Sequence, residues 1–216
     1  MTTVMERVRE HVEAVPVGRY VHTRDLIAAR LGGRTAVDVA LHRMKEDGEL
    51  RPVRRGVYYK GRRTRFGITA PDPVDAAMEV AHSAGYDGGV GPAGYTAARM
   101  LGLTTQVPAV GEVSVPGRPP ADLPQVKFVS RSPRARRRLR PIEVAVLELL
   151  GSWPRYSEES WGTFIQRVRE LAGAGEVDVT AVRAAAVGER HLKAREMADR
   201  LASELIDETV DEAATA

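Results

Sequence analysis

Apolar residues in the first 50 positions recur at intervals of three and four, which is the spacing of amphipathic helices. The pattern predicts three short helices, over residues 3–14, 23–31 and 35–47. Thr23 is the expected N-cap of the second helix, and Gly48 is expected to end the third. Because each helix is short, we expect the segment to fold as a small helical cluster.

After the third helix the pattern changes to short stretches of strand-forming residues around an Arg55-Gly56 turn. Residues 50–60 therefore predict a basic β-hairpin. This predicted order of elements is that of a winged helix-turn-helix, which has two helices, a tight turn, a third helix and a hairpin. We therefore predict a winged helix-turn-helix DNA-binding domain over residues 1–66.

The rest of the chain alternates between helical and strand patterns. The predicted helices cover residues 74–82, 92–102, 142–151, 160–172, 178–187 and 189–207, and the predicted strands cover 111–117 and 125–130. The expected fold class is α+β, mostly helical. A mixed C-terminal domain over residues 67–216 would contain two helices, a small β element and then further helices.

Gly89-Val90-Gly91-Pro92-Ala93-Gly94 matches the G-x-G-x-x-G spacing of a dinucleotide-binding loop. Such a loop needs a buried strand before it, but the preceding segment predicts a helix and a turn. Pro92 also lacks the amide N–H that would reach a phosphate. We interpret the motif as a glycine turn that starts a helix, with Pro92 in its first turn. An enzyme that binds a nucleotide here is the alternative.

Charge is distributed unevenly, although the net charge of the 216 residues is only +3. Residues 1–70 carry 15 Lys and Arg against 8 Asp and Glu, a net charge of +7. Residues 131–140 carry six arginines and no acid, whereas residues 141–216 have a net charge of −7. Basic segments favour polyanionic partners, so the first of them strengthens the prediction of DNA binding.

The outward face of the third helix carries the candidate contacts to DNA, because a helix presented in this way can enter the major groove. Arginines of the hairpin are well placed for phosphates or the minor groove. The candidate DNA-binding residues are Arg34, Thr35, His42 and Lys45 of the helix and Arg54 and Arg55 of the hairpin. Arg51, Lys60, Arg62, Arg63 and Arg65 extend the basic strip.

No catalytic, metal or cofactor site is expected. The chain has no cysteine, which excludes disulfides, thiol nucleophiles and cysteine-ligated zinc. Its five histidines are scattered, and carboxylate pairs such as Glu158-Glu159 are adjacent, so on a helix they point in different directions. The N-terminus is charged, and no apolar run is long enough for a membrane span. We expect a cytoplasmic protein that is neither an enzyme nor a membrane protein.

Two segments together resemble the AbiEi-type antitoxins. AVDVALHRMKEDGELRPVRRGVYY resembles the winged helix-turn-helix of that family, and GPAGYTAARMLGLTTQVPAVGEVSVPGR resembles the segment that follows in related antitoxin-like proteins. The run LGLTTQVP is the more specific part, and the similarity covers roughly residues 5–150. The resemblance implies an antitoxin that binds inverted repeats in its own promoter DNA, represses its operon and neutralises a cognate nucleotidyltransferase-like (AbiEii-like) toxin.

The arginine block RSPRARRRLR leaves three interpretations open: a solvated linker, an extension of the DNA footprint, or a surface that faces the toxin. The last is the one that the resemblance favours. Its candidate residues are Arg134, Arg136, Arg137 and Arg138. The alternative function is a plain winged-helix transcriptional regulator whose C-terminal domain senses a ligand or dimerises. Both functions predict a salt-sensitive complex with promoter DNA.

Overall fold

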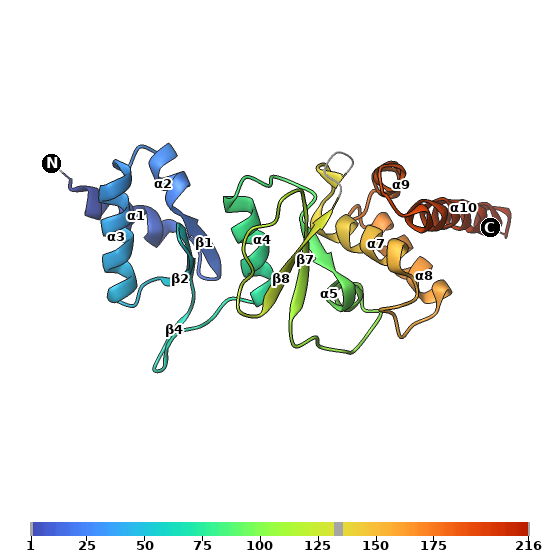
Figure 1. Cartoon of the computed structure of the whole chain (residues 1–216), viewed down its shortest axis with the longest axis horizontal. Coiled ribbons are helices and arrows are strands. Elements are labelled where there is room, and N and C mark those ends of the chain that lie inside the picture. The colour runs from blue at the N-terminus through green and yellow to red at the C-terminus, as the bar shows by residue number, and fades with distance from the viewer. Residues whose placement is uncertain (1, 132–135, 216) are drawn as a thin grey trace. The chain divides into compact units, whose positions relative to one another are not determined.

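The computed structural model describes residues 2–131 and 136–215, with side chains as far as residue 205. Helices and strands are mixed in the described residues, in agreement with an α+β chain (Figure 1). The chain divides into two compact units, Met1–Ala84 and Gly85–Ala216. The domain boundary that the sequence predicts, after residue 66, lies earlier in the chain than this division.

The first unit combines four helices with five short strands. In chain order these are α1 (Val4–Ala14), β1 (Arg19–His22), α2 (Thr23–Ala28), α3 (Arg34–Glu46), β2 (Arg51–Arg54), β3 (Val57–Lys60), β4 (Arg63–Thr64), β5 (Gly67–Ile68) and α4 (Pro73–Ser83). The sequence pattern predicts α1, α3, α4 and the β2–β3 hairpin close to these bounds. Strand β1 and the β4–β5 hairpin are absent from the prediction.

A three-stranded antiparallel sheet in the order β1-β3-β2 forms the frame of the first unit. Apolar side chains of α1, α2 and α3 pack together beside it, with Val8, Leu26 and Leu41 almost fully buried. This is the core that the helical periodicity predicts, since residues three and four apart share one helix face. Burying that face leaves the opposite side of α3 exposed.

Helix α2 differs from the sequence prediction at both ends. Thr23 is its first residue rather than its N-cap; His22 occupies the N-cap position and makes no side-chain capping bond. The Thr23 amide instead donates to the Gly56 carbonyl over 3.0 Å, which ties α2 to the hairpin turn. The helix ends at Ala28, and Arg30 adopts a φ of 56° just after it.

In the part of the second unit that the structure describes, five named helices surround a small sheet. Its elements are β6 (Gly91–Ala93), α5 (Gly94–Met100), β7 (Gly111–Pro116), β8 (Val126–Arg131), α7 (Pro141–Ser152), α8 (Trp161–Gly173), α9 (Val179–Val187) and α10 (Leu192–Thr215). The sheet order is β6-β7-β8, with β6–β7 antiparallel and β7–β8 parallel. The two predicted strands and the later helices are therefore confirmed, and α10 extends past its predicted end.

Helix α7 lies at the centre of the second unit and packs against α5, α9, α10 and β6 (Figure 1). Every residue from Glu143 to Leu150 is buried. A helix that is apolar all round is a core helix, and IEVAVLELLG has that composition. Its two acids, Glu143 and Glu148, are both ion-paired to arginines.

The glycine motif is a packing feature, and its proline is not in a helix. Pro92 belongs to β6, where it pairs with Val113 at the edge of the sheet, a position that tolerates a missing N–H. Helix α5 begins at Gly94, whose φ is +55°. A Cβ at Gly91 would lie 2.5 Å from the Pro141 carbonyl oxygen. Strand β6 therefore lies within the glycine motif and not before it. The protein's own backbone fills the space beside Gly91.

Candidate nucleic-acid interface

The exposed face of α3 carries all four helix residues that are predicted from the sequence to contact DNA. Arg34 and Thr35 lie in its first turn, and His42 and Lys45 follow two turns later; all are exposed. Val37, Ala40, Leu41 and Met44 face the core instead. The helix ends as predicted, with Gly48 at a φ of +66°.

Two of these cations have acidic neighbours. The Arg34 Nε lies 3.8 Å from the Asp38 Oδ2, and the Lys45 Nζ donates to the Glu46 carboxylate over 2.8 Å. The hydrogen bond to Glu46 raises the pKa of Lys45, so the ammonium stays charged. Exposed pairs of this kind contribute little free energy, so a phosphate can replace either carboxylate.

Three arginines from three different elements line one groove of the first unit. Arg24 comes from α2, Arg34 from the start of α3, and Arg55 from the β2–β3 turn. The groove has a volume of about 370 Å³, and Thr23, Ile27, Gly56 and Ser83 complete its wall. The sequence pattern predicts Arg34 and Arg55 as DNA contacts but not Arg24, because nothing in the second helix indicates the direction of that side chain.

The β2–β3 hairpin is short and held against the rest of the unit. Arg55 in its turn is exposed, whereas Arg54 is half-buried. Lys60 is not part of a phosphate-facing strip: its ammonium donates to the carbonyls of Val12, Glu13 and Val15 over 2.6–2.8 Å. It therefore satisfies the C-terminal end of α1, which corrects the expectation for this residue.

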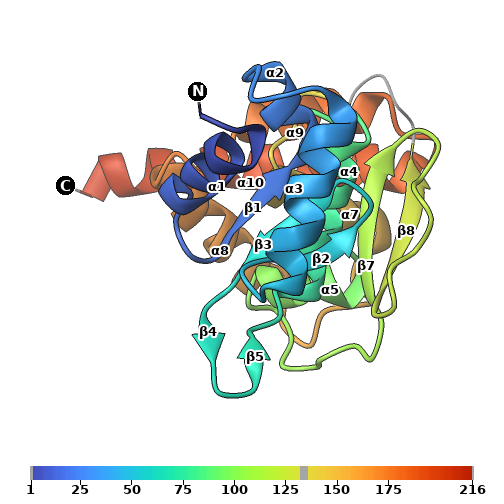
Figure 2. The same ribbon diagram turned by 90° about the vertical axis from the view of Figure 1, so that its left-hand side faces the viewer.

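A second arginine-rich hairpin follows, formed by β4 and β5, and it projects as a separate arm (Figure 2). Arg62, Arg63 and Arg65 are exposed along it, and Phe66 at its tip is 84% exposed. The Arg65 guanidinium lies 4.6 Å from the centre of the Phe66 ring. The arm is attached beside the end of α3, because Arg63 donates to the Asp47 carbonyl over 3.2 Å. Its two-residue strands explain why no sequence pattern predicts it.

The arginine block is divided between the interior and the surface. Arg134 lies outside the described residues, and Arg137 and Arg138 are exposed. Arg136 is only 3% exposed, and its guanidinium pairs with the carboxylates of Glu148 and Glu189. Arg136 is therefore an interior residue rather than part of an exposed partner surface.

Glu148 is held by a second arginine as well. The Arg131 Nε and Nη2 each donate to one of its carboxylate oxygens over 2.8 Å. Burial works to raise the pKa of Glu148, but the hydrogen bonds and charges of Arg131 and Arg136 outweigh it and hold the pKa below its usual range. The carboxylate is therefore ionised and satisfied inside the second unit.

The described residues contain no group of three or more His, Cys, Asp or Glu side chains that could hold a metal ion. None of the helices in the described part of the chain is long and apolar enough to cross a membrane.

Comparison with known proteins finds distant structural similarity only. No protein-family model matches the chain, and no curated protein matches it. The crystal structure of the RV2827C protein from Mycobacterium tuberculosis is similar with a TM-score of 0.47 and 18% sequence identity, over 95% of this chain and 78% of that chain. A similarity at this level assigns no function.

Proposed function

We propose that this chain binds double-stranded DNA through a winged helix-turn-helix formed by its first unit. The observation that carries the proposal is the groove lined by Arg24, Arg34 and Arg55, next to the exposed face of α3. Three like charges around one concavity favour a polyanion. The element order α1-β1-α2-α3-β2-β3 and the sheet order β1-β3-β2 support it.

In this proposal α3 enters the major groove. Arg34 and Thr35 at its N-terminal end, and His42 and Lys45 further along, face base edges and the phosphates on either side. Arg24 and Arg55 contact phosphates that flank the groove, and the β4–β5 arm reaches the neighbouring part of the duplex. The activity is binding, and no reaction is involved.

We propose further that the chain is an autorepressing antitoxin of the AbiEi type, whose partner is a nucleotidyltransferase-like toxin encoded beside it. The resemblance over the LGLTTQVP run motivates this. Thr104, Thr105 and Gln106 of that run all donate hydrogen bonds to one carboxylate, that of Glu158. The run thus has a defined structural role in the second unit.

A plain regulator with a ligand-sensing second unit is the other candidate function. It is favoured by a polar cavity of about 580 Å³ in that unit. The two candidates share the DNA-binding unit and differ in what the second unit does.

Fluorescence anisotropy with a labelled fragment of the gene's own promoter tests DNA binding. Affinity should fall steeply as salt rises, and Arg34→Ala with Lys45→Ala should weaken binding by about tenfold or more. Arg99→Ala with Arg167→Ala removes one exposed and one half-buried charge from the second unit and serves as the matched control. Equal affinity of the two double variants would refute the assignment of α3.

Co-expression with the neighbouring nucleotidyltransferase-like gene tests the antitoxin proposal. Growth should be restored by the intact chain. If the soluble protein fails to rescue growth, or if no such gene lies beside it, the antitoxin proposal is wrong while the DNA-binding proposal stands on its own measurement.

A further inference from the structure

The β4–β5 arm carries the most exposed large apolar side chain in the described part of the chain. Phe66 is 84% exposed, and it lies outside the apolar core of the first unit. Single exposed apolar residues are common on protein surfaces and need no special role. Phe66 differs from these in its position, because it occupies the tip of an arm whose other exposed side chains are polar or basic.

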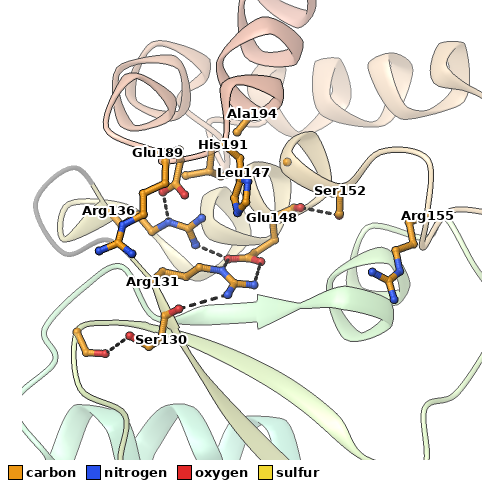
Figure 3. A pocket seen from close by; sticks show the side chains of 13 residues that line it. Ser130, Arg131, Arg136, Leu147, Glu148, Ser152, Arg155, Glu189, His191 and Ala194 are labelled. Carbon is orange, nitrogen blue, oxygen red and sulfur yellow. Dashed lines mark hydrogen bonds and ion pairs between the residues drawn. The ribbon is translucent and has the colours of Figure 1, made fainter.

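The positive charge of the arm has no acidic partner. Residues 50–71 contain seven Lys and Arg and no Asp or Glu. Arg62, Arg63 and Arg65 are exposed, and among the described residues no carboxylate lies within ion-pair distance of them. Figure 3 shows the opposite situation in the second unit, where each of the two interior arginines pairs with a glutamate. The arm therefore favours a polyanion.

Hydrogen bonds hold the base of the arm. The Arg62 amide donates to the Thr69 hydroxyl over 3.0 Å, and the Thr69 amide donates to the Arg62 carbonyl over 3.0 Å. The Arg51 guanidinium donates to the Ile68 carbonyl over 3.3 Å. A Cβ at Gly61 would lie 2.5 Å from the Thr69 carbonyl oxygen, so the two sides of the base are in close contact. The arm therefore projects from the first unit in a defined direction.

The turn at the tip is fixed by one hydroxyl group. Thr64 pairs with Gly67, which leaves Arg65 and Phe66 as the two turn residues. The Thr64 hydroxyl donates to the Gly67 carbonyl over 2.8 Å and accepts from the Phe66 amide over 3.2 Å. A tip whose backbone is already ordered loses little conformational entropy when it binds.

The arm is attached at the C-terminal end of α3, where Arg63 donates to the Asp47 carbonyl. Arg34 lies at the other end of this 13-residue helix, about 20 Å away. From residue 62 to residue 66 an extended chain reaches about 13 Å. The major groove is roughly 12 Å wide. An arm of this length beside a helix in the major groove can therefore pass the phosphate backbone and enter the adjacent minor groove.

We propose that this protein bends the DNA it binds, with the Phe66 ring inserted from the minor groove between two neighbouring base pairs. The inference rests on the proposed DNA binding and adds a distortion of the duplex to it. Apolar side chains inserted in this way unstack one base step and kink the duplex by roughly 20–90° toward the major groove. Pyrimidine–purine steps unstack most easily, so the arm selects such a step. The arginines beside Phe66 meet the flanking phosphates.

Energy transfer between fluorophores on the two ends of the promoter duplex tests the bend with the full chain. All proteins are compared at saturation, which anisotropy establishes for each. The unmodified chain should raise the transfer efficiency, because a bend brings the ends closer together. The duplex bound by Phe66→Ala should give the efficiency of the free duplex, whereas Phe66→Leu keeps an apolar side chain and should keep most of the bend. Val17→Ala removes another exposed apolar side chain of the first unit and is the matched control.

A fluorescent base analogue locates the insertion. 2-Aminopurine, placed in turn at successive positions of the duplex, becomes brighter where its base stacking is lost. One step beside the α3 contact should brighten severalfold with the unmodified chain and with Val17→Ala. The same step should stay dark with Phe66→Ala.

Three results would overturn the proposal: saturating protein leaves the transfer efficiency unchanged, Phe66→Ala bends the duplex as much as the unmodified chain does, or no 2-aminopurine position responds. In each case anisotropy still reports a complex, so the DNA-binding proposal stands. A Phe66 that instead contacts a protein partner gives the second result. If anisotropy detects no complex at all, the DNA-binding proposal and the bend are both wrong.

Discussion

The amide of Thr105 donates a 2.8 Å hydrogen bond to the carboxylate of Glu158, which is 53 residues further along the chain. The side chains of Thr104 and Gln106 donate to the same carboxylate over 2.8 and 3.0 Å. These donors, first the Thr105 amide and then the side chains, lower the pKa of Glu158 to about 2. One charged group therefore fixes the conformation of the most distinctive run in the sequence.

Glu158→Gln should destabilise the second unit in a pH-dependent way. The folded-state pKa is depressed, so the ionised carboxylate stabilises the fold fully above about pH 4.5, and this contribution is lost as the pH falls towards 2. At pH 7 the variant should unfold about 2–4 °C lower, and the difference should narrow below pH 4.5. Both tryptophans, Trp153 and Trp161, lie in this unit, so their fluorescence reports its unfolding.

Glu159→Gln is the matched control, since no hydrogen bond to that carboxylate is among the described contacts. Its unfolding midpoint should follow that of the unmodified chain across the pH range. A Glu158→Gln midpoint that ran parallel to the control would contradict the role of the carboxylate.

Arg136→Met should cost about 3–5 kcal/mol of unfolding free energy, because it leaves Glu189 buried without its arginine and Glu148 with only one. Adding Glu189→Gln removes one uncompensated charge and should restore part of the loss. Urea unfolding followed by tryptophan fluorescence measures both. Equal stability of the single variant and the unmodified chain would show that Arg136 is not an interior ion-pair partner.

Lys60→Met should destabilise the first unit by about 1–3 kcal/mol, because three carbonyl groups at the end of α1 lose a charged donor. Amide hydrogen exchange in peptides from α1 measures this, and it should speed up. Arg62→Met, on the exposed arm, should leave that exchange unchanged. DNA affinity of the folded Lys60 variant should stay the same; a smaller salt slope would mean that Lys60 contacts phosphate after all.

Gly91→Ala should destabilise the second unit by about 1–3 kcal/mol, because the added methyl group would collide with the Pro141 carbonyl oxygen and with Val144. Gly173→Ala is the contrasting change, since the new methyl group in α8 would meet no atom within 4 Å beyond its chain neighbours and the backbone of its own helix. It should stabilise the unit by about 0.5–1 kcal/mol. Urea unfolding of both variants tests whether the glycine motif serves packing.

Phe66→Ala should weaken promoter binding by several-fold while leaving the unfolding of the first unit unchanged, because the ring is 84% exposed and packs against no core residue. An apolar side chain at the tip of a basic hairpin suits insertion between bases. Anisotropy titrations on the promoter fragment measure the effect. Unchanged affinity would place the β4–β5 arm outside the DNA contact.

Local patterns predict the helices well, because the signals that define them lie within one or two turns. The buried face of α3, including Val37 and Leu41, follows from spacing alone, and so does the exposure of Arg34 and Lys45. Strand β1 has only four residues, too few for an alternating pattern to stand out. A segment this short becomes a strand only because β3 pairs with it.

The side-chain roles that escaped prediction all depend on partners distant in sequence. Lys60 contacts carbonyls 45–48 residues away, and Arg136 meets one glutamate 12 residues away and another 53 residues away. From the sequence alone both are simply cations in basic segments. The burial of Arg136 follows from the position of α7, which no local signal determines.

The central position of α7 has a consequence for synthesis of the chain. The core of the first unit uses residues no further along than Tyr58, so it can close while the ribosome is still adding the rest. The core around α7 also requires side chains as far along as Leu201 in α10. The core of the second unit must therefore wait until Leu201 has been added, so the two units of one polypeptide mature at different times.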